Sequence, residues 1–432
     1  MRVLFVSGEL IAADLCLRLQ QEGCEVKLYI EDEGRRDCLD GMIEKVTDWE
    51  KELDWVGKNG LIVFDDIGYG KIQDDLRSEG YNVVGGSLGG DKLEKEREFG
   101  QVVFSTYGLN ALKTINFTKI SEAVNFIKKN PCAWVIKQNG HISALNYVGQ
   151  WSDGSDAISI LESYRRLNGN LGTISLQKRV DGVEIGVGRY FNGKEWIGPI
   201  ELNIEHKHLC NGSIGPMTGE MGTVMWYTEN EKNRLFQGTL AKLKPFLEKV
   251  NFKGDIDINC IVDKKHIYPL EATARFGCPA IQLQTEIHKS PWKDFLLAVA
   301  KGEKYDLKYK KGFGVVVSIA IPPFPYKSIS TDYHDKGVKI FFKEKLSKKE
   351  LASLHFEEVS LKKTNCTEDL CVAGSNGFIM YVSGFGKNAK SARHQAYELV
   401  KKINIPKMFY RDDIGERFVK KDMKTLREWN WI

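Results

Sequence analysis

Apolar and polar positions in the first ninety residues follow two periods. Short apolar runs at residues 2–7, 25–30 and 61–64 have the length of buried strands. Residues 10–21, between the first two runs, carry apolar side chains at helical spacing. This order predicts βαβ units in a parallel, Rossmann-like sheet. Ligands of such sheets bind at the carboxyl ends of the strands. The residues at those ends are Ser7, Gly8, Glu9, Asp65, Asp66, Gly85 and Gly86.

The next stretch of the chain mixes the two periods. Residues 91–108 predict one charged amphipathic helix. Residues 111–176 alternate helix and strand patterns, with one helix opened by Thr118, and predict a small α/β lid. A further helix is expected over residues 228–250.

Two β-hairpins are predicted in the same stretch. The first spans residues 183–198, with its turn at Asn192 and Gly193, a pair that favours a tight turn. The second spans residues 255–284 and turns at residues 263–265. Its strands alternate, so each carries polar side chains on one face. These side chains are Asp255, Asp257 and Asn259 on the first strand, and Glu271, Thr273 and Arg275 on the second.

The second hairpin has two interpretations. Three unpaired carboxylates on one surface repel one another, so they need a cation or water. Oxygen ligands at this spacing suit Mg²⁺ bridged to substrate phosphates. The alternation alone favours the simpler interpretation, which is the solvated polar face of an ordinary hairpin.

Beyond residue 310, strand patterns at residues 314–326 and 377–386 are followed by a helical pattern at residues 391–403. We therefore expect a final α+β domain over residues 311–432. The fold class is α/β and α+β multidomain, because 432 residues are too many for one small core.

Composition narrows the class of protein. A hydrophobic content of 42% and a charged content of 28% are typical of soluble globular proteins. The net charge of +4 gives no case for nucleic acid. Neither a membrane-length apolar run nor a signal-peptide pattern is present, so we expect a cytoplasmic location. The nine cysteines include no CxxC pair, which favours reduced thiols over a zinc site or disulfides.

Two further features leave alternatives open. Lys137 ends an apolar strand just before Asn139 and Gly140, so it is either a phosphate contact or a snorkelling edge lysine. Residues 205–222 are rich in glycine and predict a long polar loop. Its backbone N–H groups can bind anions, although a flexible surface loop is the commoner case.

Four segments in a fixed order resemble the ATP-grasp ligases, specifically the phosphoribosylamine-glycine ligase (glycinamide ribonucleotide synthetase) family. They are VDGVE at residues 180–184, GPMTGEMG at 215–222, LEATARFGCP at 270–279 and SARHQAYELVKKINIPKMFYRDDIGERF at 391–418. The resemblance covers nearly the whole chain. It implies an ATP-grasp fold with a Rossmann-like N-terminal (pre-ATP-grasp) domain at residues 1–90, an ATP-grasp domain at 91–310 and a C-terminal α+β domain at 311–432.

The resemblance also implies a chemistry and the residues that perform it. ATP phosphorylates a carboxylate, an amine attacks the acyl phosphate, and catalysis is mainly positioning and charge neutralisation. By position, the nucleotide is bound by Arg97, Lys137, Gln177, Lys178, Val180 and Glu184. Mg²⁺ or Mn²⁺ is held by Glu271 and Thr273 with Asp257 or Asn259. The reacting carboxylate lies near His206, Lys207 and Arg275, and Asp255 becomes a surface carboxylate.

The chain departs from the family pattern at the substrate and phosphate loops. SGELIAADL at residues 7–15 lacks the arginine and the glycine pair of the family's phosphate cradle. QNGHISALNYV at residues 138–148 lacks the lid glycines and a second lysine. Further replacements are Thr273 for asparagine, Cys278 for aspartate, Ala280 for glutamate, and the intruding Met217 and Glu220.

Three functions therefore remain. The first is the family reaction of glycine with phosphoribosylamine in purine biosynthesis. The second is an ATP-grasp ligase for another amino acid or amine, and the third is a non-catalytic nucleotide-binding homologue. Retention of Lys137, Glu184, Glu271 and Arg275 together disfavours the third. The expected partners are small molecules, namely an amino acid such as glycine and an amine, with no membrane or nucleic acid, and the protein is expected to be a monomer or homodimer.

Overall fold

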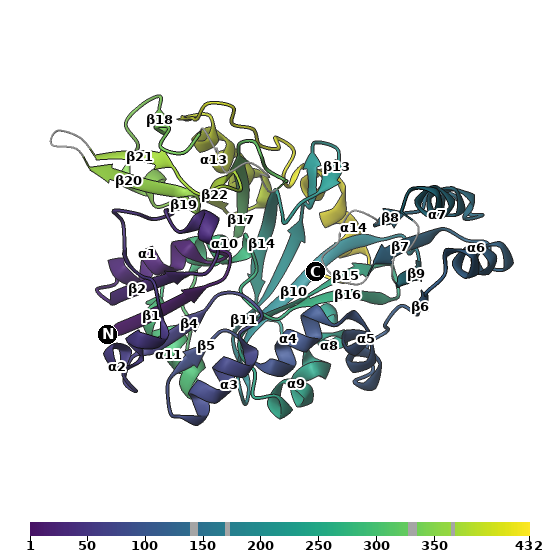
Figure 1. Ribbon diagram of the computed structural model, residues 1–432, viewed down its shortest axis with the longest axis horizontal. Coiled ribbons are helices and arrows are strands. Elements are labelled where there is room, and N and C mark those ends of the chain that lie inside the picture. The colour runs from purple at the N-terminus through teal and green to yellow at the C-terminus, as the bar shows by residue number, and fades with distance from the viewer. Residues whose placement is uncertain (139–145, 169–172, 327–334, 364–367) are drawn as a thin grey trace.

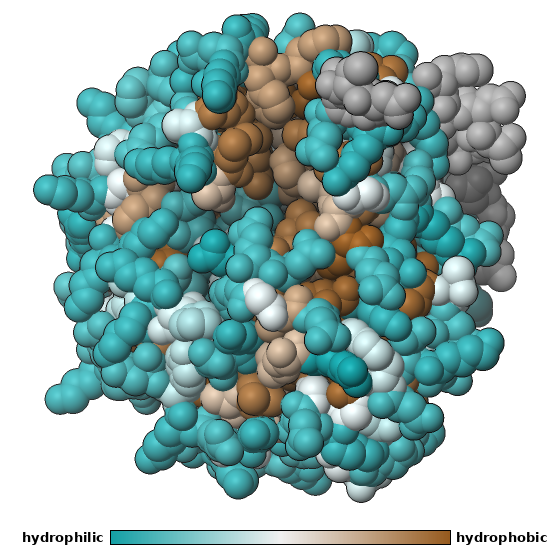
Figure 2. Space-filling view, turned by 90° about the vertical axis from the view of Figure 1, so that its left-hand side faces the viewer, coloured by the Kyte–Doolittle hydropathy of each residue, from teal (hydrophilic) through white to brown (hydrophobic). Residues whose placement is uncertain are grey.

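The structure, a computed structural model, describes residues 1–138, 146–168, 173–326, 335–363 and 368–432. A long central sheet is flanked by the N-terminal domain on one side and by a projecting lid on the other (Figure 1). The face on the side of the N-terminal domain is mainly hydrophilic, with smaller apolar patches (Figure 2). Among the described helices, none has both the length and the apolar character needed to cross a membrane.

The predicted parallel sheet at the N-terminus is confirmed. Its strands run in the order β3-β2-β1-β4-β5, and every neighbouring pair is parallel. The strands are β1 (Arg2–Ser7), β2 (Glu25–Ile30), β3 (Glu44–Val46), β4 (Leu61–Phe64) and β5 (Val83–Val84). The helices are α1 (Ala13–Gln21), α2 (Leu53–Val56) and α3 (Gly70–Ser78). Strand β3 was not predicted, because EKV carries no apolar run.

The helix predicted over residues 91–108 is wrong in one respect. The structure has two helices there, α4 (Leu88–Lys95) and α5 (Arg97–Thr106). They are separated at Glu96, whose φ of −100° and ψ of 89° are not helical. The break turns the chain so that residues 94–99 line a cavity.

The predicted lid is a four-stranded sheet with two helices. Its strand order is β6-β9-β7-β8, and it has its own small apolar core. The strands are β6 (Thr114–Phe117), β7 (Trp134–Gln138), β8 (Tyr147–Val148) and β9 (Ile174–Lys178), and the helices are α6 (Ile120–Lys129) and α7 (Ser155–Asn168). Helix α6 begins after Lys119 without a side-chain cap, so the predicted opening by Thr118 is wrong. Residues 139–145 of the altered lid segment, with Asn139 and Gly140, lie outside the described residues.

One antiparallel sheet connects the central and C-terminal parts. Its order is β16-β15-β10-β11-β14-β17-β22-β19. The strands are β10 (Val183–Asn192), β11 (Trp196–Glu205), β14 (Gly222–Thr228), β15 (Lys253–Val262), β16 (Ile267–Thr273), β17 (Phe313–Ala320), β19 (Leu354–Phe356) and β22 (Phe378–Gly386). Both predicted hairpins are present, as β10–β11 and β15–β16. The boundary expected near residue 311 therefore falls within the span of a single sheet, because β14 pairs with β17.

The alternation predicted for β15 is confirmed, but its polar face is not solvated. Ile256, Ile258 and Cys260 are fully buried in the main core. On the opposite face Asp255 and Asn259 are also buried, being 6% and 2% exposed. Asp255 is thus a buried carboxylate, and the expectation of a surface position is wrong. Neighbouring strands and α10 (Ala280–Ile287) cover this face.

Two other segments differ from the prediction. Residues 205–222 contain a short hairpin, β12 (His208–Cys210) with β13 (Ile214–Met217), instead of a loop throughout. The helix expected over residues 228–250 is split at Thr239 into α8 (Arg234–Gly238) and α9 (Leu240–Lys249). Thr239 has φ −130° and ψ −97°, which a helix does not allow.

The remaining elements cover the C-terminal side of the central sheet. Helix α11 (Trp292–Lys301) packs on the N-terminal domain, and α13 (Ala389–Val400) packs on β22 and β17. The others are α12 (Lys348–Leu351), β18 (Phe341–Phe342), β20 (Val359–Lys363), β21 (Glu368–Val372), β23 (Ile403–Asn404) and α14 (Met423–Glu428), with a π turn at Phe418–Asp422.

Candidate active site

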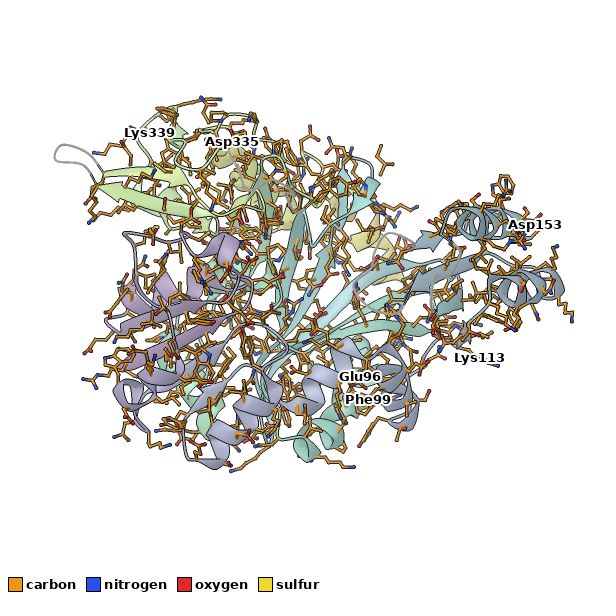
Figure 3. The ribbon with its side chains drawn as sticks, viewed as in Figure 1. Glu96, Phe99, Lys113, Asp153, Asp335 and Lys339 are labelled. Carbon is orange, nitrogen blue, oxygen red and sulfur yellow. The ribbon has the colours of Figure 1, made fainter. Side chains whose placement is uncertain are left out.

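A cavity of about 940 Å³ lies against the central sheet. It is enclosed by residues 94–99, by one face of β10, β11, β15 and β16, and by residues 218–220. Glu96 and Phe99 lie beside it on the α4–α5 segment, whereas Lys113 and Asp153 belong to the projecting lid (Figure 3). A volume of this size accommodates a nucleotide and a small second substrate.

Six predicted site residues line this cavity. They are Arg97, Lys207, Asp257, Glu271, Thr273 and Arg275. The polar face of the hairpin therefore points into a cavity. This placement removes the simpler interpretation of a solvated polar face.

An ion-pair network lies at one end of the cavity. Lys207 Nζ is 2.8 Å from Glu271 Oε1 and 3.0 Å from Glu205 Oε2. Lys207, with smaller contributions from Lys137 and Arg97, lowers the pKa of Glu271 to about 2. Glu271 is therefore anionic throughout the physiological range.

Lys137 faces the same network from the lid. Burial lowers the pKa of Lys137 to about 8, and the positive charge of Arg97 acts in the same direction. Glu271 and Glu184 oppose that shift. A snorkelling lysine on the outside of the lid would not sense these charges, so the geometry favours the phosphate-contact interpretation of Lys137.

Oxygen donors lie beside Glu271. Asn259 is paired with Glu271 across β15 and β16, and Asp257 is paired with Thr273. Asn259 Nδ2 donates to Glu184 Oε1 at 2.7 Å and to Glu205 Oε2 at 2.9 Å. The Oδ1 atoms of Asn259 and Asp257 are buried and accept no hydrogen bond in the structure.

This donor set fits Mg²⁺ held partly by a nucleotide. Within the described ranges, no three His, Cys, Asp or Glu side chains are gathered so that they could hold a metal ion by themselves. Mg²⁺ is commonly bound by one or two carboxylates together with substrate phosphates. Glu271, with the free oxygens of Asn259 or Asp257, provides that partial set. Thr273 remains a predicted ligand.

The predicted adenine segment joins the lid to the central sheet between β9 and β10. Gln177 is buried, and its Nε2 donates to Leu112 O at 3.3 Å and to Thr114 Oγ1 at 3.4 Å. Its side chain thus fixes the lid sheet. Lys178 and Glu184 are exposed, and Val180 is half-buried. The adenine and ribose roles of these residues remain predictions.

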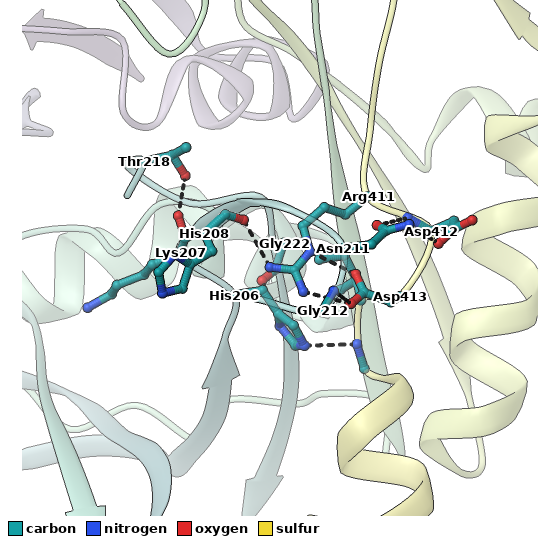
Figure 4. A network of polar contacts seen from close by, with 12 residues as sticks. His206, Lys207, His208, Asn211, Gly212, Thr218, Gly222, Arg411, Asp412 and Asp413 are labelled. Atoms are coloured by element: carbon teal, nitrogen blue, oxygen red, sulfur yellow. Dashed lines mark hydrogen bonds and ion pairs between the residues drawn. The ribbon is translucent and has the colours of Figure 1, made fainter. Parts of the chain in front are cut away.

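His206 lies within the protein, in a network that ties the C-terminal segment to the sheet (Figure 4). Its Nδ1 lies 3.1 Å from Gly222 O, and its Nε2 accepts from the N–H of Gly415 at 3.1 Å. Arg411 reinforces the same junction, donating to His208 O at 2.9 Å. Because both ring nitrogens of His206 are engaged, the geometry favours a structural role over its predicted catalytic role.

The protonation of His206 predicts a pH-dependent stability. Burial lowers the pKa of His206 from 6.5 to about 4. Between these values the unfolded chain binds a proton that the folded chain does not, so stability falls as the pH drops from about 6.5 to about 4.

Urea unfolding across this pH range tests the prediction. His206→Gln is expected to make the pH dependence shallower by up to about 1.4 kcal/mol per pH unit. His266→Gln, at an exposed turn, is the control and should keep the wild-type slope. Equal slopes for wild type and His206→Gln would contradict the role of His206.

Arg275 connects the cavity to the N-terminal domain. Its Nε lies 3.2 Å from Glu94 Oε1 and 3.5 Å from Asp66 Oδ1. Asp66 follows β4, so the predicted ligand edge of the parallel sheet does meet the hairpin. Asp65, in contrast, forms its hydrogen bonds within the N-terminal domain. Its Oδ2 accepts from Ser7 Oγ at 2.8 Å and from the N–H of Ala12 at 3.0 Å.

Several cavity residues were missed in the sequence. Glu201, Asn203 and Glu205 line the cavity from β11. Their period-two spacing in ELNIE was a usable signal, but the strand was considered only as part of a hairpin. Glu94 was missed because residues 91–108 were taken as one helix. Glu220 had been noted only as a departure from the family loop, and its carboxylate is buried beside Thr223.

Comparisons with known proteins agree with this geometry. Residues 95–281 match the family model described as phosphoribosylglycinamide synthetase, ATP-grasp (A) domain. This match and the solved structures of similar proteins confirm the predicted fold class, with an ATP-grasp fold.

The predicted resemblance to phosphoribosylamine–glycine ligases is confirmed as well. The enzyme of that name from Clostridium acetobutylicum is 25% identical over 361 residues, covering 80% of this chain and 81% of the relative. The solved phosphoribosylamine–glycine ligase of Thermotoga maritima has a TM-score of 0.69 at 21% identity and covers 96% of this chain and 100% of its own.

More distant ATP-grasp proteins share the fold. The biotin carboxylase domain of the Hydrogenobacter thermophilus 2-oxoglutarate carboxylase was solved with MgADP, ADP and bicarbonate. It has a TM-score of 0.64 at 12% identity, covering 99% of this chain and 97% of its own.

Proposed function

We propose that this protein is an ATP-dependent carboxylate–amine ligase of the phosphoribosylamine–glycine ligase type, acting in purine biosynthesis. It would form an amide through an acyl phosphate and release ADP and phosphate. The observation that carries the proposal is the convergence of Lys207, Lys137 and Arg97 on Glu271, at one end of a cavity large enough for both substrates.

The residues have separable roles in this proposal. Lys137 from the lid and Arg97 from α5 would contact the nucleotide phosphates as fixed positive charges. Lys207 would hold Glu271 in place and face the transferring phosphoryl group. Mg²⁺ or Mn²⁺, held by Glu271 with Asn259 or Asp257, would neutralise phosphate charge. Arg275 would orient the carboxylate substrate from the opposite side.

Two experiments test the proposal. Purified protein should show magnesium-dependent ADP release when glycine and phosphoribosylamine are supplied. The gene should also restore growth without added purines to a bacterium that lacks the corresponding purine enzyme. Absence of ADP release with any pool of amino acids and amines, while ATP still binds, would contradict a catalytic function.

A second candidate is a ligase of the same mechanism with a different amine or amino acid. The geometry of the loop after β1 supports it. A Cβ placed on Gly8 would lie 2.9 Å from Asp66 Oδ2, so a carboxylate occupies the space beside this loop. The family's phosphate cradle corresponds to the same loop, where Asp66, paired with Arg275, now occupies the space.

A substitution in the lid, Lys137→Ala, tests the nucleotide-binding role of Lys137 separately from the other site residues. Lys137→Ala is expected to raise the apparent KM for ATP about tenfold, with a smaller effect on kcat, because a single charge-assisted phosphate contact is lost. Lys113→Ala, an exposed lysine of the lid, is the matched control and should behave as wild type. An unchanged apparent KM for ATP in Lys137→Ala would instead support the interpretation of Lys137 as a snorkelling lysine.

A further inference from the structure

Glycines of the central strand β10 leave a slot in the floor of the cavity. Gly188 is paired with Glu201 on β11 and with Asp257 on β15. A Cβ at Gly188 would lie 3.2 Å from Asp257 Oδ2 and 3.6 Å from Glu201 Cβ. Two carboxylates therefore face each other across a strand position that has no side chain.

Amide side chains hold these carboxylates in place. Asn203 Nδ2 donates to Asp257 Oδ2 at 3.0 Å and to Glu201 Oε1 at 3.3 Å. Gln284 Nε2 donates to Glu201 Oε2 and to Asp255 Oδ2, both at 2.9 Å. We call Glu201, Asn203, Asp255 and Asp257, grouped around Gly188, the acidic slot.

The acidic slot has oxygen acceptors without donors. Asn203 is 2% exposed, lines the cavity, and its Oδ1 accepts no hydrogen bond in the structure. Asp257 Oδ1 is likewise buried and unpartnered. Two unpartnered acceptors in a buried site need donors from a ligand or from water, because leaving them unpaired is costly.

The slot also lacks positive charge. Within the described part of the chain, no Lys, Arg or His forms an ion pair with Glu201, Asp255 or Asp257. Carboxylates outnumber cationic side chains nine to four among the cavity-lining residues. The cations Lys207 and Arg275 are already paired with Glu205, Glu271, Glu94 and Asp66.

We propose that the acidic slot binds a primary ammonium group of the substrate. The substrate class is a diamine, a polyamine or a basic amino acid. An ammonium group has three N–H donors and no acceptor, which matches the free oxygens of Asn203 and Asp257. With Asp257 in the slot, Asn259 is the residue that holds the metal together with Glu271. This inference rests on the proposed ligase function.

Calorimetric titration of the full chain tests the proposal without requiring turnover. The probes are putrescine, spermidine, lysine and, as the phosphorylated contrast, phosphoethanolamine. We expect at least one of the three cationic probes to bind and phosphoethanolamine not to bind. Binding of putrescine or spermidine assigns the ammonium group to the amine substrate, and binding of lysine alone assigns it to the carboxylate substrate.

Slot variants locate the binding. Asp257→Asn and Glu201→Gln are expected to weaken binding of that probe about tenfold or more, because each removes a carboxyl group that can carry the charge opposite the ammonium group. Gly188→Val keeps every charge but fills the slot, and the φ of Gly188 is not in the left-handed region that favours glycine. It should also weaken binding. Glu248→Gln removes one exposed carboxylate on α9 and should leave binding unchanged.

Three outcomes would overturn the proposal. The first is that no cationic probe binds to the wild type, and the second is that the slot variants bind the probe as tightly as the wild type does. The third is that Asp257→Asn loses Mn²⁺ binding, measured without nucleotide, but keeps probe binding, which would make the slot a metal site. ADP release is measured separately. If the slot variants release ADP as the wild type does, the proposed ligase function still holds. If the probe binds in the slot but the protein releases no ADP, the proposed ligase function itself is rejected.

Discussion

Glu271→Gln is expected to lower magnesium-dependent ADP release about 10²–10³-fold, which corresponds to the several kcal/mol that a metal ion contributes to phosphoryl transfer. Glu271 is held anionic by Lys207 at 2.8 Å, with Lys137 and Arg97 nearby. Glutamine keeps the size of the side chain and removes the charge. Lys207 would then pair with Glu205 alone, and a metal ion bound as proposed would lose its anionic ligand.

Steady-state ADP release and calorimetric ATP binding are measured on the same preparation. ATP affinity is expected to change far less than turnover, because the phosphate contacts proposed for Lys137 and Arg97 remain. Glu248→Gln, an exposed carboxylate on α9, is the matched control for loss of one charge. Wild-type turnover in Glu271→Gln would show that Glu271 is not a metal ligand.

Arg35→Met is expected to destabilise the protein by about 3–5 kcal/mol, since it leaves two buried carboxylates without a cation. Arg35 lies between Glu357 and Glu358, and the three side chains are 4%, 7% and 0% exposed. Its Nε is 3.0 Å from Glu358 Oε1, and it also donates to Glu9 O. It therefore connects the N-terminal domain to the C-terminal part of the chain.

Urea unfolding at neutral pH measures this loss. The adjacent Arg36 is the matched control, because its ion pair with Glu33 is between side chains 52% and 83% exposed. Arg36→Met should cost less than about 1 kcal/mol. Adding Glu357→Gln to Arg35→Met should recover part of the loss. Equal stability of the two arginine variants would refute the buried connection.

Much of the fold could be predicted from local pattern. Apolar runs located β1, β2 and β4, and period-two alternation located β15 and β16 with their turn. The helix breaks at Glu96 and Thr239 could not be predicted in this way, because helical spacing continues through both. Their backbone angles are decided by what α5 and α9 pack against.

Part of the candidate site could also be predicted from local pattern. Glu271, Asp257 and Arg275 were found because they alternate on a recognisable strand pair that the family resemblance also marks. The burial of Asp255 was missed, since Gln284 and Glu201, which cover it, lie on other elements. His206 was assigned by position, and its two hydrogen bonds reach Gly222 and Gly415 at distant points of the chain.

The sequence by itself determined which side chains share a face within each strand, and its four characteristic segments predicted the ATP-grasp fold. Period two is a local property of the backbone, so it can be read without the fold. Only the tertiary structure decided which faces meet. Glu201 and Asp257 are opposed across Gly188 because β10 lies between β11 and β15 in the sheet. Strand order depends on long-range packing, and that is why the polar face of the hairpin became the floor of a charged cavity.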